Sequence, residues 1–402
     1  MVPLELLDLV ARWIHVIAGI MWAGNSLLFN WIDRSLERPD RDGITPQPVG
    51  TLWLLHSGGF YYVEKTLLAG MHGPTPRILH WFKWQAYTTW LSGFALLVVV
   101  YWAGARSLLG DPSVAVLSPG MDVVIAVGSV FGGWAVYELA QRAVAPRAPA
   151  LALALWLTAL LAITIGITMS LSGRAAYLHV GAMLGTIMAG NVFVTIVPSQ
   201  RALVASISEG PASAVTAATL SARAKRVSIH NNYFTFPVIV LMVSSHFPGL
   251  YGHPMRAALL LTLVAGGATI RHVLNIRFTF PAWRGALGGA IASTIVLLAV
   301  LMRIGARDSL PVGRSSTPVT FADVRHVVDR RCASCHASEP SDMSSGPAPG
   351  GVKFDTPGDI VRHAARIRER AVVTRTMPPN NKSRITDDER AVLARWNGAL
   401  VP

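Results

Sequence analysis

The chain has 402 residues, of which 52% are hydrophobic and only 14% are charged. This balance is too apolar for an average soluble domain and indicates a membrane protein. The formal net charge is +13, but the basic residues are spread over the loops between apolar stretches. That distribution is typical of membrane topology and gives no indication of nucleic-acid binding.

Eight apolar stretches are long enough to be candidate membrane spans, although the sixth is short. They are Leu6–Asn30, Trp84–Ala103, Met121–Leu139, Ala148–Leu171, Ala175–Val197, Asn232–Phe247, Met255–Ile276 and Gly285–Ile304. The first has no small-residue cleavage site after a short apolar core, so we expect an anchor and not a removed signal peptide. The apolar region Thr51–Ala69 contains His56, Glu64 and Lys65, and we expect it to be an interfacial or re-entrant segment.

Polar residues inside the first and fifth spans are candidates for function, because such residues are costly in a bilayer. His15, Gly19, Trp22 and Ser26 share one helix face, and His179, Met183, Thr186 and Gly190 share another. Both spans also contain an Ala-Gly-Asn triplet, at 23–25 and 189–191. Two four-helix halves related by a weak internal repeat would explain this pattern. His15 and His179 could then hold a b-type haem between helices; alternatively, each histidine bonds a backbone carbonyl or a neighbouring helix.

A second group of polar residues lies at the other end of the predicted bundle. The sixth span begins with His230-Asn231-Asn232, and the seventh ends with Arg271, His272 and Asn275. Arg271 and Asn275 share a helix face at spacing i, i+4. Arginine, amides and an imidazole are suited to a flat anion with carbonyl and N–H edges. Glu64 is expected near the same boundary; positive-inside charge and interfacial anchoring are the alternative explanation.

The pentapeptide Cys332-Ala333-Ser334-Cys335-His336 is the C-x-x-C-H attachment signature of a c-type haem. Its two thiols can each form a thioether with one porphyrin, and the histidine is placed to ligate the iron. No other cysteine occurs in the chain. A redox disulfide or half a zinc site is the alternative, but a zinc site needs two more Cys or His at matching spacing, and none follows.

Met377 is the candidate for the second axial ligand of this haem, because thioether sulfur is a common one. The two prolines that follow it favour a stiff extended segment. Met343 is the rival ligand, but it lies in the Ser/Gly/Pro-rich run 341–351, which is typical of a mobile loop. The remaining alternative is an ordinary core methionine.

Helix signals around the haem motif fit a small cytochrome c. We expect one helix over Phe321–Arg331, and a second that opens with the capping box Thr386-x-x-Glu389. Val392, Leu393, Trp396 and Leu400 would line one face of the second helix. The predicted fold is therefore all-α: a transmembrane bundle over residues 1–304, a linker over 305–319 and a cytochrome c domain over 320–402.

Topology follows from two independent arguments. Haem is attached covalently outside the cytoplasm, so the C-terminal domain should be periplasmic, and eight spans then place the N-terminus there too. On this orientation the basic residues of the cytoplasmic loops outnumber those outside, in agreement with the positive-inside rule. The cytoplasmic set is Arg34, Arg38, Arg41, Lys65, Arg77, Arg142, Arg147, Arg201, Arg223, Lys225, Arg226, Arg277 and Arg284.

Several stretches of the chain resemble the bacterial membrane-bound urate hydroxylases, which join an eight-span domain to a C-terminal cytochrome c. They are Arg12–Val16, His56–Tyr61, His80–Trp84, Gly185–Ala189 and Ser228–Tyr233. The resemblance covers nearly the whole chain, and its order of domains is specific. One departure is Asn380, where the family pattern has a glycine before the asparagine; this affects the loop at the haem edge and not ligation.

The resemblance implies oxidation of urate to 5-hydroxyisourate, with electrons passed to cytochrome c and not directly to oxygen. It also implies a multi-pass protein of the bacterial inner membrane, with lipid, urate and a downstream cytochrome c or terminal oxidase as partners. His230, His272 or Glu64 could take the urate proton, and Arg271 would neutralise the anion. The main alternative is a quinol-to-cytochrome c electron-transfer module; a transporter fused to a cytochrome has no support in the sequence.

Overall fold

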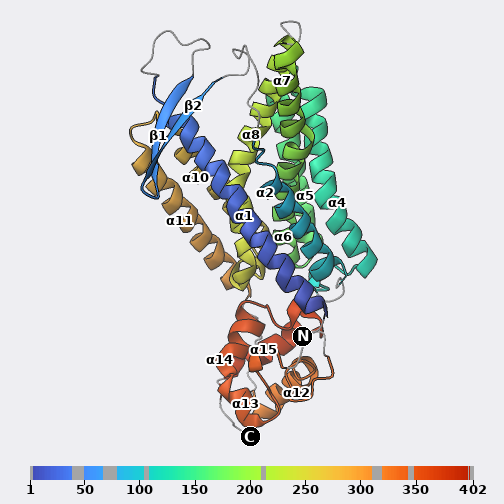
Figure 1. Cartoon of the computed structure of the whole chain (residues 1–402). Coiled ribbons are helices and arrows are strands. Elements are labelled where there is room, and N and C mark those ends of the chain that lie inside the picture. The colour runs from blue at the N-terminus through green and yellow to red at the C-terminus, as the bar shows by residue number, and fades with distance from the viewer. Residues whose placement is uncertain are drawn as a thin grey trace. The chain divides into compact units, whose positions relative to one another are not determined.

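The computed structural model describes residues 3–38, 49–66, 79–103, 108–209, 214–309, 319–342, 348–396 and 398. These residues form a mostly helical fold with one two-stranded sheet (Figure 1). The transmembrane-region elements are α1 (Pro3–Ser35), β1 (Gly50–His56), β2 (Gly59–Lys65), α2 (Trp84–Leu96), η2 (Leu97–Trp102), α4 (Pro119–Leu139), η3 (Ala140–Val144), α5 (Pro149–Ser170), α6 (Gly173–Gly190), η4 (Asn191–Ile196), α7 (Val197–Glu209), α8 (Ala214–Val243), η6 (Ser244–His246), α9 (Pro248–Tyr251), α10 (Arg256–Ile276) and α11 (Trp283–Ser309).

Seven helical stretches of the described chain are long and apolar enough to cross a membrane, which makes this a multi-pass membrane protein. They are Leu6–Ser35, Pro119–Val144, Pro149–Ser170, Gly173–Ser206, Thr219–His246, Arg256–Ile276 and Trp283–Ile304. The predicted second span, Trp84–Ala103, is not among them, although α2 and η2 follow each other directly from Trp84 to Trp102. The eighth span therefore stays a prediction, as does the internal repeat.

The predicted sixth span was too short. We expected it to begin at Asn232, but α8 begins at Ala214. Its first turns contain Arg223, Lys225 and Arg226, which a hydropathy pattern assigns to a loop. The helix continues past the apolar part of its sequence, because backbone hydrogen bonding does not depend on hydropathy.

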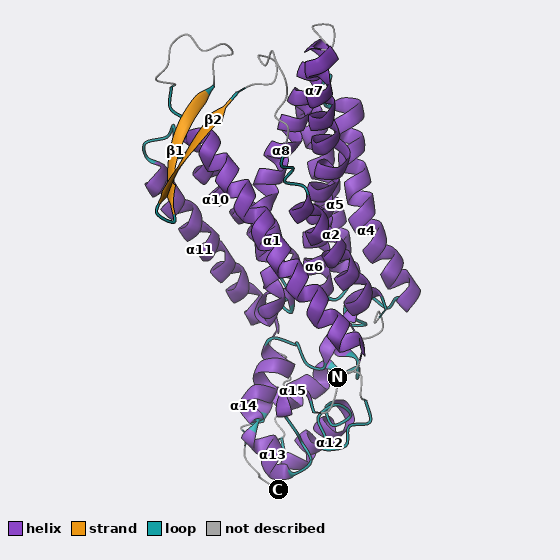
Figure 2. Cartoon of the chain, viewed as in Figure 1, coloured by secondary structure: helices purple, strands orange, loops and turns teal. Residues whose placement is uncertain are grey.

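The prediction of an all-α fold was wrong at Thr51–Ala69, where the structure forms a hairpin of β1 and β2 (Figure 2). Ser57 and Gly58 between the strands have φ values of 52° and 76°, and a two-residue type I′ turn requires positive φ at both positions. Trp53 pairs with Tyr62 across the strands, and aromatic pairs of this kind stabilise a sheet. Residues 67–69 lie outside the described residues.

Residue contacts divide the chain into two units. The first comprises residues 1–97, 184–236 and 270–287, and the second comprises residues 98–183, 237–269 and 288–402. The first unit has a small core in which Ala86, Val192 and Val197 are buried against Trp22 and Tyr87. In the second unit, the ring of Tyr137 on α4 meets that of Trp156 on α5 edge to face.

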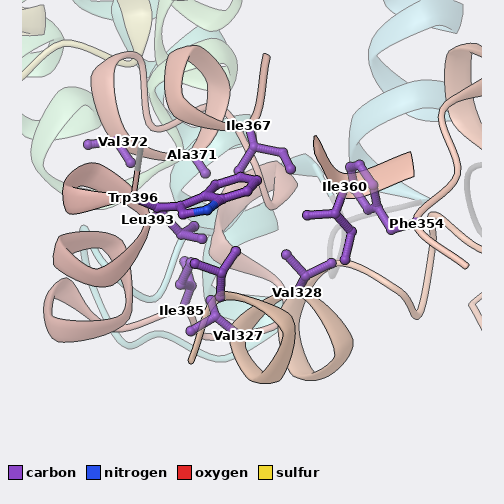
Figure 3. Close-up of a cluster of buried hydrophobic side chains, with 11 residues drawn as sticks. Val327, Val328, Phe354, Ile360, Ile367, Ala371, Val372, Ile385, Leu393 and Trp396 are labelled. Carbon is purple, nitrogen blue, oxygen red and sulfur yellow. The ribbon is translucent and has the colours of Figure 1, made fainter. Parts of the chain in front are cut away.

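The C-terminal region of the second unit contains α12 (Phe321–Arg331), η8 (Pro349–Gly351), α13 (Pro357–Arg362), α14 (Ala364–Ile367), η9 (Arg368–Val373), η10 (Pro379–Asn381) and α15 (Asp387–Arg395). These helices surround one hydrophobic cluster (Figure 3), formed by Val324, Val327, Val328, Phe354, Ile360, Ile367, Ala371, Val372, Ile385, Leu393 and Trp396. Such a cluster supplies most of the stability of a region this small. Whether the domain boundaries lie at 304 and 320 stays a prediction.

Local signals in this region were predicted well. Helix α12 has the expected bounds, and α15 follows the expected capping box of Thr386 and Glu389. Two further capping boxes, at Thr320 and Thr356, were not predicted; each pairs a threonine with an aspartate. Helix α15 ends at Arg395, so Trp396 packs into the core from just beyond the helix. Leu400 lies outside the described residues.

Candidate functional site

Three side chains on two helices of the first unit converge on one atom, and we call them the Arg271 cluster. Asn232 of α8 accepts at Oδ1 a hydrogen bond from Arg271 Nε over 3.0 Å and one from Asn275 Nδ2 over 2.7 Å. Both donors lie on α10, one turn apart, so the i, i+4 face predicted from the sequence is confirmed. The three side chains are buried, and Arg271 is only 4% exposed.

Two polar atoms of the Arg271 cluster are buried without a hydrogen-bond partner among the described residues. They are Nη2 of Arg271, a donor, and Oδ1 of Asn275, an acceptor. The guanidinium also lies over the ring of Phe236, 5.6 Å from its centroid. Because unsatisfied buried polar groups are rare and costly, this pair of atoms is a candidate site for a ligand with adjacent acceptor and donor groups.

A second pair of amides fixes the helix that carries Asn232. Asn231 accepts at Oδ1 a hydrogen bond from Asn191 Nδ2 over 2.8 Å, and donates its Nδ2–H to the carbonyl of Met188 over 3.0 Å. Asn191 is 1% exposed and begins the π-helical segment η4. Sequence reasoning singled out Asn191 only as part of a repeat and missed this partnership. Asn231 is thus a positioning residue in this arrangement.

The other predicted catalytic residues are not part of the Arg271 cluster. His272 is exposed, and its Nδ1 is hydrogen-bonded to the hydroxyl of Tyr233 over 2.8 Å. His230 is half-buried, one residue before Asn231 on α8. Glu64 is exposed on β2 and accepts a hydrogen bond from the hydroxyl of Thr66. The structure therefore brings together the guanidinium and the amides but not the candidate bases.

The predicted ligands of a second haem are His15, in the first unit, and His179, in the second. Each makes hydrogen bonds within its own unit. His15 donates from Nδ1 to the carbonyl of Thr89 over 2.9 Å, an arrangement that leaves Nε2 as the nitrogen for a metal. His179 is fully buried, donates from Nδ1 to the carbonyl of Ala175 over 2.8 Å, and accepts at Nε2 from Trp102 over 3.1 Å. Ligation by His179 Nε2 requires this bond to Trp102 to break, so His15 fits a metal as placed and His179 does not.

The C-x-x-C-H segment forms a tight turn after α12 in the second unit. The amides of Cys335 and His336 donate to the carbonyl of Cys332 over 3.2 and 3.0 Å, and neither thiol is in a disulfide. His336 donates from Nδ1 to the carbonyl of Val352 over 3.0 Å, which fixes the ring and leaves Nε2 for an iron atom. Free thiols beside an oriented imidazole fit a covalently attached haem.

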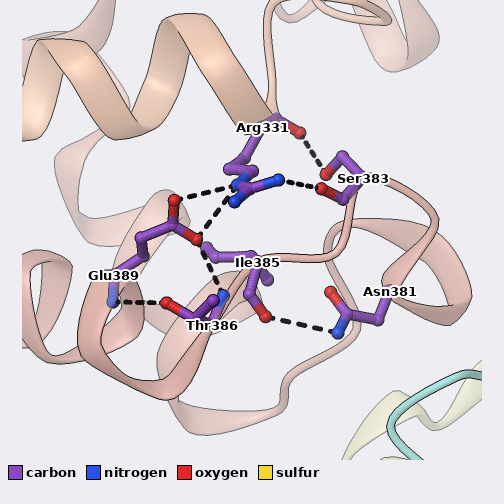
Figure 4. A network of polar contacts seen from close by, with 6 residues as sticks. All are labelled: Arg331, Asn381, Ser383, Ile385, Thr386 and Glu389. Atoms are coloured by element: carbon purple, nitrogen blue, oxygen red, sulfur yellow. Dashed lines mark hydrogen bonds and ion pairs between the residues drawn. The ribbon is translucent and has the colours of Figure 1, made fainter.

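The residue before this turn is held by a network of polar contacts (Figure 4). Arg331 donates from Nε to both carboxylate oxygens of Glu389, over 2.9 and 3.0 Å, and from Nη1 to the carbonyl of Ser383. Ser383 in turn donates to the carbonyl of Arg331 over 2.7 Å. Both partners of the ion pair are mostly buried. The network fastens the start of the turn to α15 and its preceding loop.

Met377 follows η9 and is half-buried. Its amide donates to the carbonyl of Arg370 over 2.9 Å, and its carbonyl accepts from Arg390 Nη1 over 3.2 Å. Burial lowers the pKa of Arg390 to about 10, so this guanidinium stays charged at neutral pH and holds the Met377 backbone. Met343, the rival ligand, lies outside the described residues.

These features define an integral membrane protein of several helices with a guanidinium and amides buried between two of them. Residues 2–303 match the family model described as urate oxidase N-terminal, and because the match covers most of the chain, the chain belongs to this family. No curated protein and no solved structure matches the chain. Family membership suggests an oxidoreductase that oxidises urate.

Proposed function

We propose that this chain is a membrane-bound urate hydroxylase that oxidises urate to 5-hydroxyisourate and passes the electrons to a haem c in its C-terminal region. The observation that carries the proposal is the family match over residues 2–303. The Arg271 cluster supports it with a site for the substrate, and the turn at Cys332–His336 supports it with a site for the electron acceptor.

The reaction balances with water as the source of the new oxygen. Urate and one water give 5-hydroxyisourate, two electrons and two protons. A haem c accepts one electron at a time, so the two electrons leave in separate transfers or through a second redox centre. A b-type haem on His15 and His179 as this second centre stays a prediction, because His179 Nε2 already accepts a hydrogen bond from Trp102.

The unpaired atoms of the Arg271 cluster match one edge of an oxopurine. Urate carries carbonyl and N–H groups side by side around its rings, so a carbonyl can accept from Arg271 Nη2 while the next N–H donates to Asn275 Oδ1. Arg271 would neutralise the anion, because a charge-assisted hydrogen bond in a buried site is strong. Asn232 positions the side chains of Arg271 and Asn275 by accepting a hydrogen bond from each. His230, His272 and Glu64 are the candidate bases for the substrate proton.

For the haem site we propose that Cys332 and Cys335 would hold the porphyrin through thioethers, and that His336, through Nε2, and Met377 would hold the iron. A haem held in this way supplies a one-electron acceptor. In the protein, Val352 orients the imidazole and Arg331 fixes the turn. We place the C-terminal region in the periplasm of a bacterial inner membrane, where a cytochrome c or a terminal oxidase can take the electrons onward.

The decisive experiment is anaerobic addition of urate to the purified, oxidised protein, followed by haem absorption. A pyridine haemochrome assay first establishes that haem c is present. Urate should then reduce the haem without oxygen, and 5-hydroxyisourate should form in a ratio of one molecule for two electrons. Reduction by a quinol but not by urate would replace this proposal with the quinol-to-cytochrome c alternative.

A further inference from the structure

One face of the β1–β2 hairpin is apolar and exposed. The strand register places Trp53 opposite Tyr62 and Leu55 opposite Phe60, so these four side chains share one face. Their exposed fractions are 65%, 51%, 69% and 76%. We call these four residues the aromatic face. On the opposite face Leu52, Leu54 and Val63 are half-buried, whereas Tyr61 is 54% exposed.

The open end of the hairpin is fixed to the polar end of helix α1. Glu37, just past α1, exchanges two backbone hydrogen bonds with Thr51, over 2.9 and 3.0 Å, and Lys65 forms an ion pair with Asp33 over 2.6 Å. Asp33 is near the end of a candidate membrane span. The charged residues at this end of the hairpin therefore lie where that span meets water.

Helix α1, to whose end the hairpin is fixed, carries an exposed apolar surface. Only 11% of the residues in the apolar part of α1 are buried. Trp13 and Ile20 are 67% and 68% exposed. In a membrane-spanning helix, side chains with this exposure face lipid. The hairpin is joined to the end of this helix at two points, and the two elements lie near each other in Figure 1.

We propose that the hairpin lies in the bilayer at the boundary between headgroups and hydrocarbon, with the aromatic face against lipid. Trp and Tyr favour this boundary because they combine an apolar ring with a polar group. A two-stranded sheet has unpaired backbone groups along both edges, which the hydrocarbon interior does not tolerate. The boundary satisfies both conditions, since it offers apolar contact to the rings and water to the edges.

The proposal implies that contact with lipid changes along the length of the hairpin. Each strand has seven residues and therefore extends about 23 Å. Glu64 and Thr51 lie at the charged open end, whereas Leu55 and Phe60 lie beside the closing turn. Contact with lipid should increase from Glu64, at the charged open end, through Tyr62 to Phe60, beside the closing turn. The three positions can be compared because their side chains are on the same face.

Site-directed spin labelling can test this gradient on the whole protein in phosphatidylcholine–phosphatidylglycerol vesicles. The parent has cysteines only at positions 332 and 335, so the labelled parent serves as the blank, and single labels are placed at L55C, F60C, Y62C and E64C. Power saturation compares collision with oxygen, which concentrates in lipid, and with a water-soluble nickel complex. We expect oxygen to dominate at positions 55 and 60, and nickel to dominate at position 64.

Two results would overturn the proposal. Nickel dominance at positions 55 and 60 would place the aromatic face in water. Low collision with both reagents, together with spin–spin broadening, would place a second copy of the chain on this face. L55C and F60C report on the same face from different strands, so failure of one variant to fold leaves the other. Unchanged urate-dependent haem reduction, or its loss, does not bear on the outcome, because the labels report location alone.

Discussion

The side chains of Arg271 and Asn232 are joined by a 3.0 Å hydrogen bond from Nε to Oδ1. Because Nε is used in this way, the guanidinium is fixed in orientation and its Nη2 is left without a partner among the described residues. A buried cation whose Nε is occupied and whose Nη2 is open is arranged to receive an anion, and the first prediction follows from this arrangement.

Arg271→Ala should lower kcat/KM for urate by roughly 30-fold or more. Losing a buried charged hydrogen bond to a ligand costs about 2–5 kcal/mol, at about 1.4 kcal/mol per tenfold change. The measurement is the steady-state rate of haem reduction by urate. Arg277→Ala is the matched control, because Arg277 follows the same helix and packs on Phe278. Wild-type kinetics in Arg271→Ala would remove this residue from the site.

Met377→Ala should abolish the weak absorption band between the sulfur and the ferric iron while covalent haem remains. In the proposed haem site, thioethers at Cys332 and Cys335 would hold the porphyrin whether or not Met377 is present. The measurement is near-infrared absorption of the oxidised protein, with a pyridine haemochrome assay for haem content. Met343→Ala is the control, and if this variant loses the band while Met377→Ala keeps it, the two ligand assignments must be exchanged.

A non-covalent haem held by His15 and His179 should be released by acid–acetone, at one haem per chain beyond the covalently bound one. His15→Ala and His179→Ala should each remove it. His253→Ala is a suitable control, since this half-buried histidine is hydrogen-bonded to the carbonyl of Met302. Extraction of no haem from the wild type would leave His15 and His179 as structural or substrate-binding residues.

Reporter proteins fused after Arg147 and after Arg226 should report a cytoplasmic location. A reporter fused after Arg307 should report a periplasmic location. The reason is the excess of basic residues in the loops assigned to the cytoplasm. Paired alkaline phosphatase and fluorescent-protein fusions measure the two sides with opposite signals. A periplasmic signal after Arg226 would reverse the orientation of the bundle, and a cytoplasmic signal after Arg307 would contradict eight spans.

Acid should destabilise the C-terminal helices through the capping boxes. In Glu389 burial would raise the pKa, but hydrogen bonds from Thr386 and Arg331 outweigh it and lower the pKa; hydrogen bonds within the capping boxes also lower the pKa of Asp323 and Asp359. A carboxyl with a lowered folded pKa stabilises the fold above its ordinary value of about 4, and this stability disappears as the pH falls through the folded value.

The thermal midpoint of the C-terminal region should therefore fall steeply below about pH 4. Haem absorption of the full chain is the measurement. The Glu389→Gln variant should have a lower thermal midpoint than the wild type at pH 7. Its midpoint should fall less on acidification, because residue 389 no longer titrates. An equal loss in Glu389→Gln and in the wild type would exclude Glu389 as a source of the pH dependence.

Hydropathy and helix periodicity predicted most of the helices and the shared face of Arg271 and Asn275. Both are local properties, which depend on residues within a turn or two of each other. The hairpin was not predicted because its seven-residue strands are apolar without strict alternation. The dipeptide Ser57-Gly58 was not recognised as a two-residue turn. The start of α8 was missed because charged residues extend a helix beyond its apolar part.

The candidate site was predicted only in part, for a related reason. The sequence placed Asn232, Arg271 and Asn275 at one end of the bundle but could not say which side chains meet. Contacts between helices far apart in the chain, such as Asn191 with Asn231, depend on how the helices pack. Trp102, which donates to His179, likewise lies too far away in the sequence to be paired with it by periodicity.

The π-helical segment η4 alters the helical phase between α6 and α7. A π-helical turn holds about one residue more than an α-helical turn, so residues after Ile196 point about 100° away from the direction that an unbroken α-helix would give them. Deleting one residue within 191–196 should therefore give an unbroken α-helix in which the residues beyond it keep their direction relative to His179. In this part of the chain, a one-residue gap between related sequences corresponds to loss of the π-helical turn, and the side chains on both sides of it keep their directions.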